Sequence, residues 1–171
     1  MYDKLLTLHH GTDSISARNI IRNGIDLSKS RDKLDFGKGF YLTNNKGQAV
    51  NWAIRTARAH MDKRYAVLTF ELNISLLYGK KFYGTSDEWF DNVYNHRVLG
   101  LENIDLEYDY ISGPMVDGKM PDVLNDYSNG LITKEMLQQI FSRYKNSYQI
   151  ALKTKKAIDS LSKPIKEVHP L

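Results

Sequence analysis

The segment DFGKGFYLT, residues 35–43, carries the most distinctive local pattern in the chain. Two glycines flank Lys38, and glycine permits positive φ and close approach of another group to the backbone. The run that follows has the composition of a strand, in which successive side chains face opposite ways. Phe40 and Leu42 should therefore face one side and Tyr41 the other. We expect a bent loop that feeds a short strand and presents the Tyr41 ring at a cleft.

Two common motifs share letters with this segment and are excluded. Asp-Phe-Gly occurs in protein kinases, but the chain has no H-R-D loop and no V-A-I-K strand, and its 171 residues are too few for that fold. Gly-Lys-Gly is not a phosphate-binding P-loop, because the pattern G-x-x-x-x-G-K-[ST] is absent.

Upstream, residues 5–10 read as a buried strand that ends at Gly11-Thr12. Alternation puts His10 on one face with Leu8 and puts His9 on the other. Adjacent histidines that face opposite ways make a poor metal pair. Residues 14–23 have helical apolar spacing, and the glycine after them is a natural helix stop.

Downstream, short helices and strands are mixed without regular β-α-β alternation, which indicates an α+β fold. We expect helices over residues 46–61, 87–97, 121–127, 134–143 and 155–161, strands over 65–72, 108–112 and 148–152, a loop or edge strand over 77–83, and a tail from about 163. Caps are expected at Asn44 or Asn45, Ser86, Thr133 and Thr154.

Composition indicates one soluble domain spanning residues 1–171, with 42% apolar and 26% charged residues. No run approaches the roughly 18 apolar residues of a membrane span, and the N-terminus lacks the pattern of a signal peptide. The absence of cysteine excludes disulfides, thiolate zinc sites and cysteine nucleophiles. We expect a cytoplasmic protein with no membrane partner.

The formal net charge is +4, and lysines gather near the C-terminus. A basic surface attracts nucleic acid or a nucleotide. A solvated helix face is the favoured explanation for these lysines.

Two separated motifs together resemble the ADP-ribosyltransferase superfamily, in particular its His-Tyr-Glu clade of poly(ADP-ribose) polymerase and diphtheria-toxin type. His10-Gly11-Thr12 is similar to the opening motif of that family. There the histidine binds the ribose of the adenosine half of NAD, and the glycine backbone holds the nicotinamide amide. Residues 37–41 resemble the second motif, in which a glycine turn precedes a tyrosine, here Tyr41, that stacks on nicotinamide.

The resemblance extends to two further positions. Trp52 lies eleven residues after Tyr41, where poly(ADP-ribose) polymerases place a second aromatic residue against nicotinamide. The small hydroxyl residue that usually precedes this aromatic by three positions is replaced by Ala49. The third catalytic residue of the family, often glutamate, matches Gln149 on a late strand, as in uncharacterised bacterial members that combine histidine, tyrosine and glutamine.

The resemblance implies an ADP-ribosyltransferase-like split β-core surrounded by helices, with NAD as substrate and no metal. It implies His10, Tyr41 and Gln149 as the catalytic set. The implied NAD-binding residues are Gly11, Thr12, Arg31, Lys38, Gly39, Phe40 and Trp52, with Arg31 and Lys38 at the pyrophosphate.

Cleavage of the nicotinamide–ribose bond resembles glycoside hydrolysis, with an oxocarbenium-like transition state. Nicotinamide leaves as a neutral amine, so the enzyme mainly orients NAD and stabilises positive charge. Glutamine keeps a hydrogen bond but supplies no negative charge. Glu71, Glu107 and Asp109 are the spare carboxylates that sequence offers for that purpose.

Each of these residues also has an explanation that involves no function. A histidine at a strand end and a tyrosine in a strand are common without function. Trp52 lies on an apolar helical stripe and is equally suited to core packing. Gln149 could be an ordinary strand residue, and Arg31 and Lys38 could be solvated surface.

The function expected from the resemblance is a bacterial-type mono-ADP-ribosyltransferase, such as a toxin or defence effector, acting on a protein or nucleic-acid acceptor. A neutralising partner protein is expected by analogy with related toxins. Two alternatives stay open: an NAD glycohydrolase with water as acceptor, and an inactive domain that binds a nucleotide or a partner.

Overall fold

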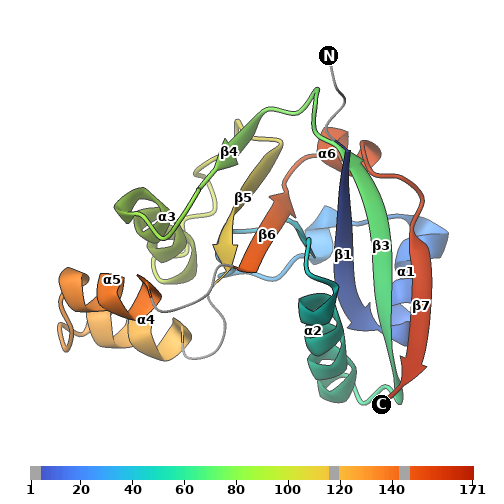
Figure 1. The fold of residues 1–171 in the computed structure, drawn as a ribbon, viewed down its shortest axis with the longest axis horizontal. Helices are drawn as coiled ribbons and strands as arrows, with labels where there is room; N and C mark the ends of the chain where they lie inside the picture. The colour runs from blue at the N-terminus through green and yellow to red at the C-terminus, as the bar shows by residue number, and fades with distance from the viewer. Residues whose placement is uncertain (1–4, 116–119, 143–146) are drawn as a thin grey trace.

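The computed structural model describes residues 5–115, 120–142 and 147–171, and Figure 1 shows their arrangement. The strands are β1 (Leu5–Asp13), β2 (Phe40–Thr43), β3 (Arg64–Asn73), β4 (Gly79–Lys81), β5 (Tyr110–Met115), β6 (Ser147–Leu152) and β7 (Ile165–Pro170). The helices are α1 (Ser14–Asn23), α2 (Lys46–Ala59), α3 (Asp87–Arg97), α4 (Met120–Ser128), α5 (Lys134–Ser142) and α6 (Lys155–Asp159), with a short 3-10 turn η1 (Leu27–Lys29).

The strands form one seven-stranded sheet in the order β4-β5-β6-β2-β1-β3-β7. Neighbouring strands are antiparallel except β4 and β5, which are parallel. This mixed sheet with its helices confirms the predicted α+β class.

Helices α1 and α2 lie on opposite faces of the β1–β3 part of the sheet (Figure 1). Ala17 of α1 packs in the core cluster that contains Leu8 and Leu68. Ala53 of α2 packs instead against Val67, the neighbour of Leu68 on β3. Because successive strand residues face opposite ways, the two helices bury opposite faces of the same strands.

A second, largely aromatic core lies where α3, α4 and α5 meet β5 and β6, at the other end of the sheet (Figure 1). Its buried members are Phe36, Phe82, Trp89, Phe90, Val93, Ile111, Leu124, Leu137, Phe141 and Ala151. Phe36 comes from residues 35–43, called the glycine-rich segment below, so this core anchors one end of that segment.

The predicted helix caps are confirmed. The side chains of Asn45, Ser86 and Thr154 each accept a hydrogen bond from a backbone N–H in the first turn of α2, α3 and α6. Thr133 accepts from the Met136 amide at 3.3 Å at the start of α5. Gly24 ends α1 with φ of 83°, a conformation that favours glycine.

Two expectations about the sheet are wrong. The segment after residue 163 is not a tail, because Ile165–Pro170 pair with Arg64–Thr69 of β3 as the edge strand β7. Prolines are tolerated at such an edge, and Pro170 occupies the last pair.

The second correction concerns β5, which continues through Gly113-Pro114 instead of ending there. The Pro114 carbonyl accepts a hydrogen bond from the Trp89 indole at 3.2 Å, so this side of the residue faces away from β6. In an antiparallel strand the N and O of one residue point to the same side, so the nitrogen of Pro114 also faces away from β6. On that side, the pairing of β5 with β4 stops at Ser112. The missing N–H of proline therefore removes no ladder hydrogen bond.

No helix among the described residues has both the length and the apolar character needed to cross a bilayer.

Candidate functional site

A cavity of about 560 Å³ opens between β1 and β2 and continues along α2. One wall comes from α1 and the segment that follows it, and the other from α2. Gln48 and His60 both line it, and their spacing along the helix and its cap corresponds to roughly 18 Å. The cavity is therefore elongated and has room for a dinucleotide rather than for a single ring.

The cavity exists because β1 and β2 pair at one position, His9 with Thr43, and separate beyond it. The next side chain, His10, occupies the gap. Its ring stacks on Phe40 with 4.3 Å between ring centroids, and its Nδ1 lies 2.8 Å from the Tyr41 carbonyl oxygen. The sheet stays continuous through one residue pair while the strands diverge into the cavity.

The hydrogen bond to Tyr41 defines the tautomer of His10. A carbonyl oxygen only accepts, so Nδ1 carries the proton and Nε2 of the neutral ring is an acceptor. Burial lowers the pKa of His10, and the bond to the Tyr41 carbonyl offsets part of that shift. A neutral imidazole with an acceptor nitrogen suits a ligand hydroxyl.

Tyr41 lines the cavity, as the sequence predicted, and its hydroxyl holds the glycine-rich segment. The hydroxyl donates to the Gly37 carbonyl at 2.7 Å and accepts from the Phe36 amide at 3.0 Å. Burial raises the pKa of Tyr41 well above its ordinary value, and the charge of Asp35 adds to the shift. The phenol therefore stays protonated, and its ring is held in one position.

The alternation predicted for β2 is confirmed. Phe40 and Leu42 belong to the core cluster under α1, whereas Tyr41 packs on the aromatic core around Phe36. Phe40 also lines the cavity beside His10.

Glycine and threonine positions of the two motifs also reach the cavity. Gly11 and Thr12 of β1 line it, and so does Gly39 at the start of β2. The Gly39 amide donates to the Ser30 hydroxyl at 2.9 Å, which ties the turn to the segment after α1. A side chain at Gly11 would meet the backbone of α2, and one at Gly39 would meet β6, so both glycines allow close packing beside the cavity.

Trp52 is 46% exposed and lines the cavity, so it is not a core residue. The core position on this helix is taken by Ala49, which is 2% exposed and lies against β1. The apolar stripe read from the sequence therefore contains two kinds of position: alanines that pack on the sheet, and a tryptophan that faces the cavity.

Gln149 is buried on β6, opposite Thr43 of β2, and lines the cavity. Its amide Nε2 donates to Asp35 Oδ2 at 2.5 Å. The other oxygen of Asp35 accepts from Nε of Arg97, with which it forms an ion pair. Asp35 is 3% exposed, and both Asp35 and Arg97 line the cavity.

Asp35 is the carboxylate that sequence reasoning missed. It opens the glycine-rich segment and is thus close to the motif in the chain, but its contact with Gln149 spans 114 positions. The carboxylates proposed from sequence lie elsewhere. Glu71 accepts from Thr7 at the surface, Asp109 binds Lys156 and Thr154, and neither they nor Glu107 line the cavity.

Of the two cations expected at the pyrophosphate, Arg31 lines the cavity and Lys38 does not. The Lys38 ammonium pairs with Asp32 at 2.9 Å on the exposed side of the loop. Arg55 of α2 lines the cavity and was not anticipated, although its spacing from Trp52 places both on one helical face. Arg55 replaces Lys38 as the second candidate phosphate ligand.

A family model described as "Protein of unknown function (DUF3990)" matches residues 6–162. The chain belongs to this family. The matched range includes all residues of the cavity named above. No curated protein matches the chain.

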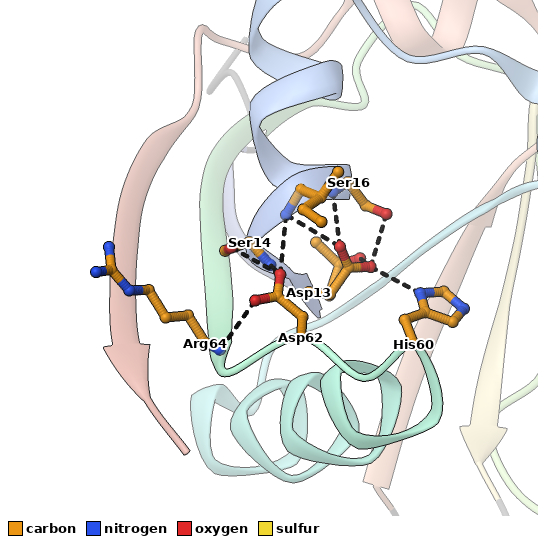
Figure 2. Close-up of polar contacts among 8 residues, drawn as sticks. Asp13, Ser14, Ser16, His60, Asp62 and Arg64 are labelled. Atoms are coloured by element: carbon orange, nitrogen blue, oxygen red, sulfur yellow. Dashed lines mark hydrogen bonds and ion pairs between the residues drawn. The ribbon is translucent and has the colours of Figure 1, made fainter.

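In this DUF3990 protein a polar cluster lies where β1, the start of α1 and the end of α2 meet (Figure 2). Asp13 caps α1 by accepting from the Ile15 and Ser16 amides and from the Ser16 hydroxyl. It also lies 2.9 Å from Nδ1 of His60, whose ring extends away from the carboxylate (Figure 2). Asp62 accepts in turn from the Ser14 amide and hydroxyl.

Opposing effects act on the Asp13 carboxyl. Burial by itself raises its pKa, but the hydrogen bonds from Ser16 and His60 outweigh burial and lower the pKa to about 2. The ionised carboxylate fixes the His60 ring, and His60 and Ser16 line the cavity. This cluster ties β1 and the start of α1 to the end of α2, and so joins the two walls of the cavity.

Within residues 5–115, 120–142 and 147–171, no group of three or more histidine, aspartate or glutamate side chains is arranged to hold a metal ion. His9 lies on the opposite face of β1 from His10, as predicted, and its Nδ1 is 2.9 Å from the Thr69 hydroxyl.

Proposed function

We propose that this DUF3990 protein is an NAD-dependent ADP-ribosyltransferase, which cleaves the nicotinamide–ribose bond and transfers ADP-ribose to a protein or nucleic-acid acceptor. The observation that carries the proposal is convergence. His10, Tyr41, Trp52 and Gln149 come from β1, β2, α2 and β6, and all four line one cavity. The motifs that contain these residues are patterns of sequence alone, so their meeting in one cavity is an independent observation.

The geometry of each residue supports its proposed role. Nε2 of neutral His10 is an acceptor for a ribose hydroxyl. The rings of Tyr41 and the half-exposed Trp52 offer surfaces on which a flat nicotinamide ring stacks, an interaction worth about 1 kcal/mol per pair. Gln149 lines the cavity beside Asp35, where we place the bond to be cleaved.

The sheet also supports the proposal. The single residue pair between β1 and β2 matches the split β-core that the resemblance implies, with the NAD cleft at the split. Arg31 and Arg55, from the segment after α1 and from α2, line the cavity between these two walls and match the charge of a pyrophosphate.

The test is release of nicotinamide from NAD by purified protein, with and without cell lysate. Wild-type protein should release nicotinamide, and His10→Ala should abolish release, whereas His169→Ala should not, because His169 lies on the edge strand β7 outside the cavity. Tyr41→Ala should also abolish release. Its control is Tyr83→Ala, which should not, because the Tyr83 side chain is 85% exposed.

The outcomes separate the candidate activities. Release that requires lysate identifies a transferase, and a radiolabelled ADP-ribose group then marks the acceptor. Equal release without lysate identifies hydrolysis or self-modification. NAD binding with no release under either condition contradicts the proposal and identifies an inactive binding domain.

A further inference from the structure

We infer that Asp35 is the catalytic carboxylate of this site and supplies, beside the reacting ribose, the negative charge that Gln149 lacks. The inference rests on the proposed function and names a residue that the resemblance does not supply. Asp35 and Gln149 would act as a pair, with the carboxylate and the hydrogen-bonding amide on different elements.

The first support is the position of Asp35. Its side chain is 3% exposed, yet it lines the same cavity as His10, Tyr41 and Gln149. A carboxylate withdrawn from water interacts with a nearby positive charge more strongly than one at the surface. Glu71, which sequence offered for this role, lies at the surface and bonds to Thr7.

The second support is the orientation of Gln149. An ionised carboxylate only accepts hydrogen bonds, so the contact of 2.5 Å with Asp35 requires Nε2 of Gln149 as donor. The Oε1 atom is thereby directed away from Asp35. An oxygen in that orientation accepts a hydrogen bond from the 2′-hydroxyl of the nicotinamide ribose, while Asp35 contributes the charge.

The third support is Arg97, whose Nε donates to the Oδ1 atom of Asp35. The positive charge of a paired arginine offsets part of the cost of withdrawing a carboxylate from water. The two oxygens of Asp35 have separate partners, because Oδ1 binds Arg97 and Oδ2 binds Gln149. The carboxylate is therefore fixed in one orientation before substrate binds.

The chemical step balances with these groups. The bond between C1′ of the ribose and the nicotinamide nitrogen breaks, and its electron pair goes to that nitrogen, which becomes neutral. Positive charge develops on C1′ and the ring oxygen, where the Asp35 carboxylate stabilises it. The acceptor then forms a bond to C1′ and releases its proton to water. Asp35 takes no part in the proton transfer.

A purely structural role for Asp35, as an anchor for Arg97 and Gln149, is the competing explanation. It predicts that loss of the carboxylate lowers stability and that a carboxylate at position 149 does not restore turnover. The two residues are in contact, so exchange of carboxylate and amide keeps the local composition and total charge unchanged.

The experiment compares wild type with Asp35→Asn, the exchange variant Asp35→Asn/Gln149→Glu, and the control Asp32→Asn. Asp32 lies close to Asp35 in the chain, but it is exposed and pairs with Lys38 outside the cavity. Nicotinamide release, NAD affinity by calorimetry and the melting temperature are measured for each protein.

We expect Asp35→Asn to bind NAD within about threefold of wild type and to release nicotinamide at least about 100-fold more slowly, a loss comparable to deletion of one stabilising group at a transition state. The exchange variant should recover to within about tenfold of wild type. Asp32→Asn should behave as wild type.

Turnover by Asp35→Asn at the wild-type rate would overturn the inference and leave the proposed function intact. So would a folded exchange variant that binds NAD and does not recover. If Asp35→Asn does not fold, the exchange variant decides, because it keeps one carboxylate in the pair. A wild-type protein that binds NAD without turnover overturns the proposed function itself, and the inference with it.

Discussion

Gly11 of β1 lies against the backbone of α2, so that a methyl group at its Cα would meet the carbonyl oxygen of Ala49 at 1.8 Å. Such a distance is far below any van der Waals contact. The helix can lie this close to the strand because position 11 carries no side chain. Gly11 and Ala49 both line the cavity, so this contact lies at its edge.

Gly11→Ala should therefore destabilise the protein by at least about 2 kcal/mol, since the added carbon meets backbone that cannot rotate away. The measurement is urea denaturation followed by circular dichroism. Gly84→Ala is the matched control, because nothing lies within 4 Å of a Cβ at that position. Equal stability of the two variants would contradict the close packing of α2 on β1.

Asp13→Asn tests the polar cluster of Figure 2. The side chain is 2% exposed, and its pKa is about 2 where the ordinary pKa of an aspartate is 3.8. A carboxyl whose pKa is lowered in the folded state adds stability above its unfolded pKa and loses it as the pH falls toward the folded pKa. The variant, which keeps a capping oxygen, should be about 2 kcal/mol less stable than wild type at pH 7.

That difference should shrink as the pH is lowered from about 4 toward 2, where the wild-type carboxylate also takes up its proton. Urea denaturation at several pH values measures it. Asp26→Asn is the control, because Asp26 caps the 3-10 turn η1 at an exposed position and should change stability little. A difference that is constant over the whole pH range would contradict the role assigned to the Asp13 charge.

Trp52 should report ligand binding by fluorescence. The chain has two tryptophans, and Trp89 is fully buried in the aromatic core, whereas Trp52 is 46% exposed at the cavity. NAD should quench the emission of wild type and leave Trp52→Phe unchanged. Trp52→Ala should weaken NAD binding about fivefold, the equivalent of one stacking interaction. Undiminished quenching in Trp52→Phe would place the nicotinamide elsewhere.

The two arginines of the cavity should contribute more to NAD affinity than the lysine of the motif. Arg31→Ala and Arg55→Ala should each weaken binding about tenfold, because each removes a charge-assisted contact to phosphate. Lys38→Ala should stay within about twofold of wild type, since Lys38 pairs with Asp32 outside the cavity. Calorimetry at two salt concentrations measures all three, and a larger loss for Lys38→Ala would reverse this assignment.

Most elements of the fold could be predicted from local patterns. The strand over residues 65–72, the helix from Ser86 and the stop at Gly24 rest on alternation, capping and positive φ, which neighbouring residues determine. Local patterns failed at Pro114 and in the segment after residue 163. In both places the outcome depends on whether a neighbouring strand forms backbone hydrogen bonds with the segment, and that is a property of the whole sheet.

The candidate site divides in the same way. By itself the sequence offered His10, Tyr41, Trp52 and Gln149 as candidates, because motif spacing and residue type are carried along the chain. Only the tertiary structure decided that Trp52 faces the cavity instead of the core, that Lys38 turns outward, and that Asp35 meets Gln149. Those outcomes depend on packing and charge pairing between segments far apart in the chain. The contact of β6 with the glycine-rich segment, which joins a carboxylate to an amide 114 positions away, has no local signature.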